Sequence, residues 1–96
     1  MTFKVGEKRK IRAVIVPADD SSIIVPNDYS FVITDKDGNI YSEGDKNQDD
    51  VIVYDSEKKE LYVTVEWIEA GFYTLKFIVE VGGETIIDTV NVTVEG

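Results

Sequence analysis

Two alternating segments near the end of the chain, joined by a pair of glycines, constrain the fold more than any other feature. In residues 72–81 and 84–94 apolar side chains recur at about every second position, which is typical of β-strands buried on one face. Gly82-Gly83 supplies the positive φ angles that a two-residue hairpin turn requires. The two segments are therefore predicted to form an antiparallel hairpin.

The turn also fixes which side chains of this hairpin face each other. The predicted pairs are Val79 with Ile86, Leu75 with Val90, and Tyr73 with Val92. Phe77 then faces Asp88, a carboxylate at a position that should point inward. We expect a β-bulge near Ile87, which would turn Asp88 outward and Ile87 inward.

The rest of the chain has the same character. It is rich in Val, Ile, Thr, Tyr and Phe, and its short alternating runs are separated by Gly, Pro, Asn and Asp. This pattern predicts an all-β sandwich or barrel of seven or eight strands, with only residues 57–62 hinting at a helix. The other strands are expected near residues 3–5, 10–16, 29–34, 40–43, 51–54 and 61–67, with a short edge strand at 23–25 left open.

Composition limits the chemistry available to the chain. Its 96 residues fit one domain, 1–96, and no run approaches the roughly 18 apolar residues that a membrane helix needs. The chain has no cysteine and no histidine, which excludes disulfides, thiol nucleophiles and the commonest general base and metal ligand. Asp88 and Glu66 are the only carboxylates embedded in apolar runs. We therefore expect no enzyme, no catalytic residues and no cofactor.

The acidic loops raise the question of calcium. Asp35, Asp37 and Asn39 alternate, and further acidic residues follow up to Asp50. Calcium prefers such oxygen ligands, but the spacing departs from an EF-hand loop, because Gly38 is fourth from Asp35 and not sixth. A hairpin turn explains Asp37-Gly38 equally well. Solvated loops are the default interpretation, and calcium binding within residues 35–50 stays open.

Charge is distributed unevenly along the chain. The net charge is −9, which disfavours nucleic acid as a partner, yet five of the ten basic residues lie in the first twelve positions. One interpretation is a basic strand neutralised by its own acidic domain, or one that discourages strand addition at a sheet edge. The other is a docking edge for an acidic protein, including a second copy of the chain. The candidate interaction edge, called the basic segment below, comprises Lys8, Arg9, Lys10 and Arg12.

Tyr62 is a candidate for an exposed aromatic side chain. In residues 61–67 the inward positions are Leu61, Val63, Val65 and Trp67, which leaves Tyr62 pointing outward. An exposed row of aromatic rings could stack on sugars. Cross-strand tyrosine contacts that only stabilise a sheet are the alternative.

Residues 69–75 read Glu-Ala-Gly-Phe-Tyr-Thr-Leu, which resembles the acidic-x-Gly-x-Tyr-x-Cys signature at strand F of immunoglobulin domains. The resemblance implies that Tyr73 is a structural corner whose hydroxyl bonds to the upstream backbone. Leu75 stands in the cysteine position, and Phe31 or Ile33 must replace the usual tryptophan of the third strand. The expected fold is an immunoglobulin-like antiparallel β-sandwich without a disulfide.

A narrower resemblance concerns phage particles. Residues 2–7, Thr-Phe-Lys-Val-Gly-Glu, resemble the aromatic-x-x-Gly-acidic opening of amino-terminal domains in phage upper baseplate and tail proteins. An apolar strand at 11–16, the Asp37-Gly38 turn and the Ala-Gly-aromatic corner at 70–73 extend the likeness. It implies a non-enzymatic virion component that assembles through protein–protein contacts, including homo-oligomers. Such a protein would lie in the virion, or in the host cytoplasm before lysis.

A second interpretation is a module of a bacterial surface protein. In that case the domain would belong to an adhesin or stalk, as part of a longer chain at the cell surface, and could bind a glycan through Tyr62. Neither interpretation involves nucleic acid or insertion into a membrane.

Overall fold

The computed structural model describes residues 1–14, 26–48 and 50–96, and these residues form eight strands. In the described parts of the chain, no helix is long and apolar enough to cross a membrane. The strands are β1 (Thr2–Lys4), β2 (Lys8–Val14), β3 (Asp28–Asp35), β4 (Ile40–Asp45), β5 (Ile52–Asp55), β6 (Glu60–Glu66), β7 (Gly71–Val81) and β8 (Glu84–Glu95).

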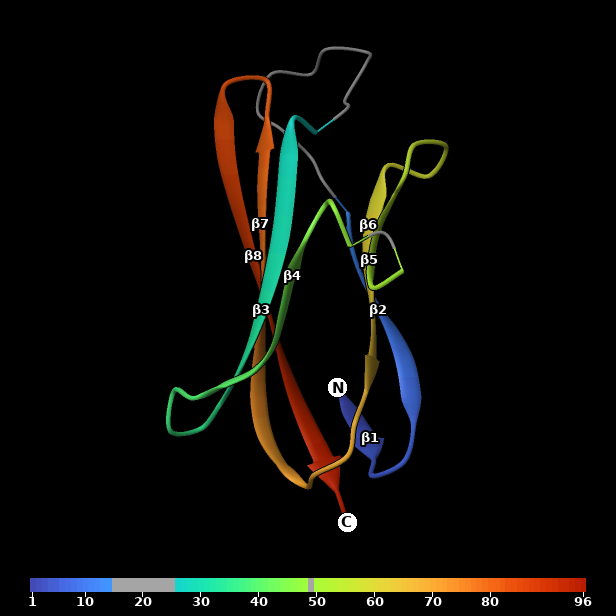
Figure 1. Cartoon of the computed structure of the whole chain (residues 1–96), viewed down its shortest axis with the longest axis vertical. Coiled ribbons are helices and arrows are strands. Elements are labelled where there is room, and N and C mark those ends of the chain that lie inside the picture. Colours follow the sequence, from blue (N-terminus) through green and yellow to red (C-terminus); the bar gives the residue numbers. More distant parts are fainter. Residues whose placement is uncertain (15–25, 49) are drawn as a thin grey trace.

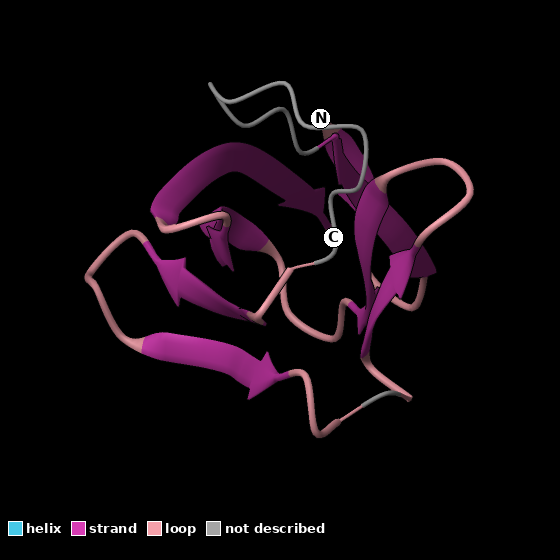
Figure 2. Cartoon of the chain, turned by 90° about the horizontal axis from the view of Figure 1, so that it is seen from above, coloured by secondary structure: helices cyan, strands magenta, loops and turns pink. Residues whose placement is uncertain are grey.

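The strands form two sheets that pack face to face (Figure 2). One sheet has the order β1-β8-β7-β3-β4 and the other has the order β2-β6-β5 (Figure 1). Neighbouring strands are antiparallel, except that β1 runs parallel to β8. The order β8-β7-β3-β4 opposite β2-β6-β5 matches strands G, F, C and C′ opposite B, E and D of an immunoglobulin domain. The predicted all-β, immunoglobulin-like sandwich is confirmed.

The closing hairpin has the predicted register but lacks the predicted bulge. All four expected pairs occur, including Phe77 with Asp88, and pairing continues without a shift along both strands. Ile87 points outward and is 59% exposed, so the predicted β-bulge is wrong. Asp88 holds its inward position but is exposed, and its inward neighbours Ile86 and Val90 are only half-buried. The described part of the three-stranded sheet does not cover this stretch of β8, so the carboxylate remains in water without a bulge.

The core lies between the sheets and is built from the inward positions of both. Phe31 and Ile33 of β3 are buried where an antibody domain has its tryptophan, as expected. No helix forms around residues 57–62, which contain a turn followed by the start of β6. The edge strand left open at 23–25 lies outside the described residues. The largest fully buried side chains are Trp67, Phe31, Phe77, Ile11, Ile33, Ile52, Leu61 and Leu75.

Gly44 provides a test of this packing. A Cβ atom at Gly44 would lie 2.8 Å from Cε1 of Phe31, which is 2% exposed, and 2.8 Å from Oε1 of Gln48, so these neighbours would have to shift. Gly44→Ala is expected to lower the free energy of unfolding by about 1–3 kcal/mol, as overpacking does in other cores. Glu43→Ala, at the exposed neighbouring position, is the control and should stay within about 0.5 kcal/mol of wild type. Urea denaturation measures both, and equal stability of the two variants would contradict the packing described.

Candidate functional site

A concave surface lies at the end of the sandwich where residues 67–70 connect β6 to β7 and residues 36–39 connect β3 to β4 (Figure 1). We call it the end pocket. Its volume is about 540 Å³. Its lining includes three large apolar side chains and three carboxylates, namely Ile40, Ile68 and Phe72, and Asp35, Asp37 and Glu69.

The apolar side chains of the end pocket are unusually exposed. Ile40 is 59% exposed, Ile68 is 70% exposed and Phe72 is 64% exposed. Single exposed apolar residues are common on soluble proteins, but here three of them line one concavity. This grouping makes the concavity a candidate contact surface.

An aromatic cluster supports the floor of this surface. The ring of Trp67 stacks on Tyr41 at 5.5 Å between centroids and lies 5.2 Å from Tyr73, and Tyr41 meets Tyr73 edge to face at 4.8 Å. Phe3 approaches Trp67 from β1, at 6.1 Å. The indole is fully buried, and its Nε1 has no hydrogen-bond partner among the described residues, so packing alone positions it.

Two tyrosine hydroxyls hold the segment that presents Ile68. The hydroxyl of Tyr41 donates to the carbonyl of Glu66 at 2.9 Å and accepts from the amide of Ile68 at 3.0 Å. The hydroxyl of Tyr73 donates to the carbonyl of Glu69 at 2.8 Å. The last contact is the one that the immunoglobulin resemblance implies for Tyr73. Residues 66–69 are thus fixed before any partner binds.

The backbone of the same segment is held from a second side. The amide of Gly6 donates to the carbonyl of Trp67 at 2.7 Å, and the amide of Trp67 donates to the carbonyl of Glu7 at 2.9 Å. These bonds join the turn after β1 to the end of β6. The exposed Ile68 therefore directly follows Trp67, whose ring is packed in the aromatic cluster and whose amide and carbonyl are both hydrogen-bonded.

The Asp35 carboxylate shapes the neighbouring turn. Its Oδ1 accepts hydrogen bonds from the amides of Asp37 and Asn39, both at 2.9 Å. These bonds, that from Asn39 above all, hold the pKa of Asp35 below its usual value, so the group stays ionised. In the described ranges no three carboxylates converge as metal ligands would, and calcium binding by residues 35–50 gains no support from this geometry.

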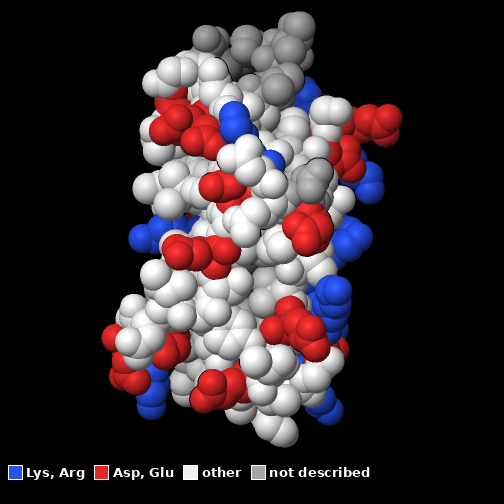
Figure 3. Space-filling view, in the orientation of Figure 1, with Lys and Arg blue, Asp and Glu red and all other residues white. Residues whose placement is uncertain are grey.

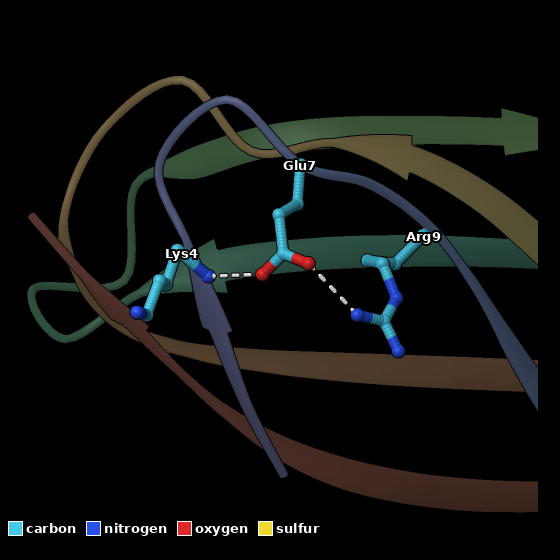
Figure 4. Close-up of polar contacts among 3 residues, drawn as sticks. All are labelled: Lys4, Glu7 and Arg9. Atoms are coloured by element: carbon cyan, nitrogen blue, oxygen red, sulfur yellow. Dashed lines mark hydrogen bonds and ion pairs between the residues drawn. The ribbon is translucent and has the colours of Figure 1, made fainter.

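The basic segment is divided between two faces of β2. Arg9 shares the inward side with the buried Ile11, and its guanidinium lies 2.8 Å from the carboxylate of Glu7 and 4.8 Å from the centroid of the Phe3 ring. Figure 4 shows Glu7 between this guanidinium and the backbone amide of Lys4, which donates to Glu7 at 2.7 Å. The hydrogen bond from Lys4 and then that from Arg9 lower the pKa of Glu7. Arg9 is therefore committed within its own domain.

The other three basic residues point to the outer face of the three-stranded sheet. Arg12 lies 3.7 Å from Glu60, and Lys8 pairs in register with Glu66 on β6. In Figure 3 basic and acidic side chains alternate along the right-hand edge, the side on which Figure 1 places β2. This arrangement fits a basic strand neutralised by its own domain better than one continuous docking edge.

Tyr62 points outward from β6, between the buried Leu61 and Val63. Its side chain is half-buried, so the ring is not fully exposed for stacking on a sugar. The ammonium group of Lys10 lies 5.2 Å from the centroid of its ring. The ring therefore supports a cross-strand contact, which is the alternative interpretation given above.

Sequence reasoning did not find the end pocket. Its apolar residues come from three separate segments, and the exposed Ile68 lies between strands, where alternation assigns no face. One residue could have indicated the end pocket from the sequence. Phe72 is a large apolar residue at an outward position of β7, a strand whose inward positions are already apolar.

No family model and no curated protein matches the chain. Among solved structures, it is similar to CopC from Methylosinus trichosporium OB3b, with a TM-score of 0.65 and 20% sequence identity over 98% of this chain and 83% of that one. CopC is a copper-binding β-sandwich, and at this identity the likeness concerns the fold.

This finding corrects the phage interpretation of the sequence. A solved structure that matches nearly the whole chain is that of CopC, which is not a phage component. The expected role as a baseplate, tail or virion protein is wrong. The two motifs that suggested it, the opening at residues 2–7 and the Ala-Gly-aromatic corner at residues 70–73, occur here in a β-sandwich whose fold is shared with CopC, a protein of another kind.

Tyr73→Phe tests how firmly the corner is held. Loss of the hydrogen bond to Glu69 is expected to lower the free energy of unfolding by about 1 kcal/mol at pH 7. Burial raises the pKa of Tyr73 above 10.0, so the stabilisation from its protonated hydroxyl is complete below pH 10 and is lost as pH rises through the folded-state pKa. The difference between wild type and variant should therefore narrow in alkaline solution. Urea denaturation from pH 7 to 11 measures it, and a constant difference would contradict the assignment.

Proposed function

We propose that this chain is a non-catalytic protein-binding module whose partner docks on the end pocket. The observation that carries the proposal is the exposure of Ile40, Ile68 and Phe72 around a segment fixed by two tyrosine hydroxyls. These hydrogen bonds hold the backbone so that an apolar side chain stays exposed to water, and the free protein gains no stability from burying that side chain. They favour association instead, because a surface that is ordered in advance loses little conformational entropy when it binds a partner.

The size of the patch limits the expected affinity. Complete burial of a large apolar side chain contributes about 1.5–3 kcal/mol, and association costs at least about 4 kcal/mol. The three side chains can therefore anchor a complex but cannot make it tight alone. With further contacts around the three side chains, we expect a dissociation constant between about 1 μM and 1 mM, equivalent to about 4–8 kcal/mol.

Catalysis is not part of the proposal because the two carboxylates with the most apolar sequence contexts are separated. Asp88 is exposed on β8 of the five-stranded sheet, and Glu66 is exposed on β6 of the other sheet. They do not share a cleft, as paired acid and base groups must.

Copper binding is not carried over from CopC. Copper prefers imidazole, thiolate and thioether ligands, and this chain has no histidine, no cysteine and one methionine. Copper(II) is therefore expected to leave the melting temperature unchanged. Thermal denaturation with the metal and with chelator measures it. If the protein had a copper site with a micromolar dissociation constant, free copper at roughly 100 times that constant would raise the free energy of unfolding by about 2.7 kcal/mol. A saturable stabilisation of that size would contradict the expectation.

The main test uses the double variant Ile68→Ser with Phe72→Ser. Immobilised wild-type protein captures candidates from the source cells, and each identified partner is then purified and titrated alone by calorimetry. The variant is expected to weaken binding by about tenfold or more, since central apolar contacts dominate such interfaces.

The matched control is Ile87→Ser. Ile87 is also exposed on the five-stranded sheet, at 59%, but it does not line the end pocket. Its substitution should leave affinity unchanged. Equal losses with the control, or full binding by the double variant, would refute a role for the end pocket.

A further inference from the structure

We infer that the end pocket takes a cationic apolar segment of the partner protein, in which a large apolar side chain is flanked by Lys or Arg. This inference rests on the proposed function and adds the chemistry of the ligand. The apolar side chain would lie against Ile68 and Phe72, and its basic neighbours would meet the carboxylates at the rim. The reason lies in the charges that surround the exposed apolar side chains.

The rim of the end pocket carries three carboxylates against one cation. Asp35, Asp37 and Glu69 line it together with Lys36. In the described part of the chain, neither the carboxylate of Asp37 nor that of Glu69 has a hydrogen-bond or ion-pair partner. These charges are therefore available to a ligand.

Three of the ten basic side chains contact groups away from this rim. Arg9 is paired with Glu7, Arg12 with Glu60, and Lys10 lies over an aromatic ring. All three belong to β2, which is in the other sheet from the turn that carries Asp37. Three carboxylates and one lysine line the end pocket, so negative charge is in excess there, as it is in the whole chain with its net charge of −9.

The environment of Tyr73 reports the same potential from beneath the pocket. Burial is the main cause of its raised pKa, and the negative charges of Glu69 and Asp35 add to it, together with Tyr41. A cation placed at the rim would be attracted to these charges. An acidic segment would be repelled, so the rim also selects against wrong partners.

Two synthetic peptides serve as probes. In both, a Leu-Phe pair is flanked on each side by two charged residues within Gly and Ser, with Lys in one peptide and Glu in the other. Titration into ¹⁵N-labelled protein is followed by amide chemical shifts. The lysine peptide is expected to shift the amides of Ile40, Ile68 and Phe72 saturably, and to bind about tenfold or more tightly than the glutamate peptide.

A charge-swap variant separates the rim from overall charge. Asp37→Lys with Glu69→Lys should reverse the preference, so that the glutamate peptide binds at the end pocket. The matched control, Glu43→Lys with Glu80→Lys, makes the same change in net charge at exposed positions outside the pocket. It should leave the preference for the lysine peptide intact.

Three results would overturn the inference. Equal binding of both peptides at the end pocket would leave an apolar docking site without charge selection, and the proposed function would stand. Equal effects of the two charge variants, with shifts spread over all acidic loops, would show non-specific attraction. Shifts of the same amides on concentration without peptide would assign the pocket to a second copy of this chain. Failure of the proposed function itself is read separately, from the partner titrations with the serine variants.

Discussion

The hydroxyls of Tyr41 and Tyr73 are the contacts on which the site depends. Both rings come from the five-stranded sheet, and both hydroxyls bond to the backbone that leaves β6 of the other sheet. Trp67 packs against both rings, so the two sheets are joined at this end by packing and hydrogen bonds together. A chain without cysteine has no disulfide to join its sheets, and here the aromatic cluster does so. The same contacts set the position of Ile68, which couples the stability of this end to the shape of the pocket.

The charges of the chain divide along the same architecture. The basic segment lies in β2, where alternation sends one guanidinium toward Glu7 and the remaining basic side chains toward acidic and aromatic groups of β6. These contacts involve three of the ten basic side chains and stabilise the domain only modestly, because the groups are largely exposed. At the end pocket, the carboxylates of Asp35, Asp37 and Glu69 outnumber the single cation Lys36. The exposed apolar side chains of the end pocket therefore lie among an excess of acidic groups.

The sequence was sufficient for the fold but only partly for the site. The register of the closing hairpin followed from Gly82-Gly83 and a period of two, and both are local properties. The prediction of a β-bulge was wrong because the local sequence pattern does not reveal that Asp88, although in the inward phase, is exposed to solvent. Periodicity also assigns no direction to Ile68, which lies outside a strand. Its approach to Tyr41, 25 or more positions away in the chain, depends on the packing of one sheet against the other.

The likeness to CopC shows why the fold could be predicted more readily than the function. A β-sandwich needs alternating apolar residues and suitable turns, and many sequences meet that need, so two chains with 20% identity can share it. The core imposes few demands on the loops at either end of the sandwich. In this chain the backbone of residues 66–69, which lead from β6 toward β7, is nevertheless held by five hydrogen bonds, and Ile68 among them is exposed to water. This combination of a constrained backbone and an exposed apolar side chain is the physical basis of the docking proposed for the end pocket.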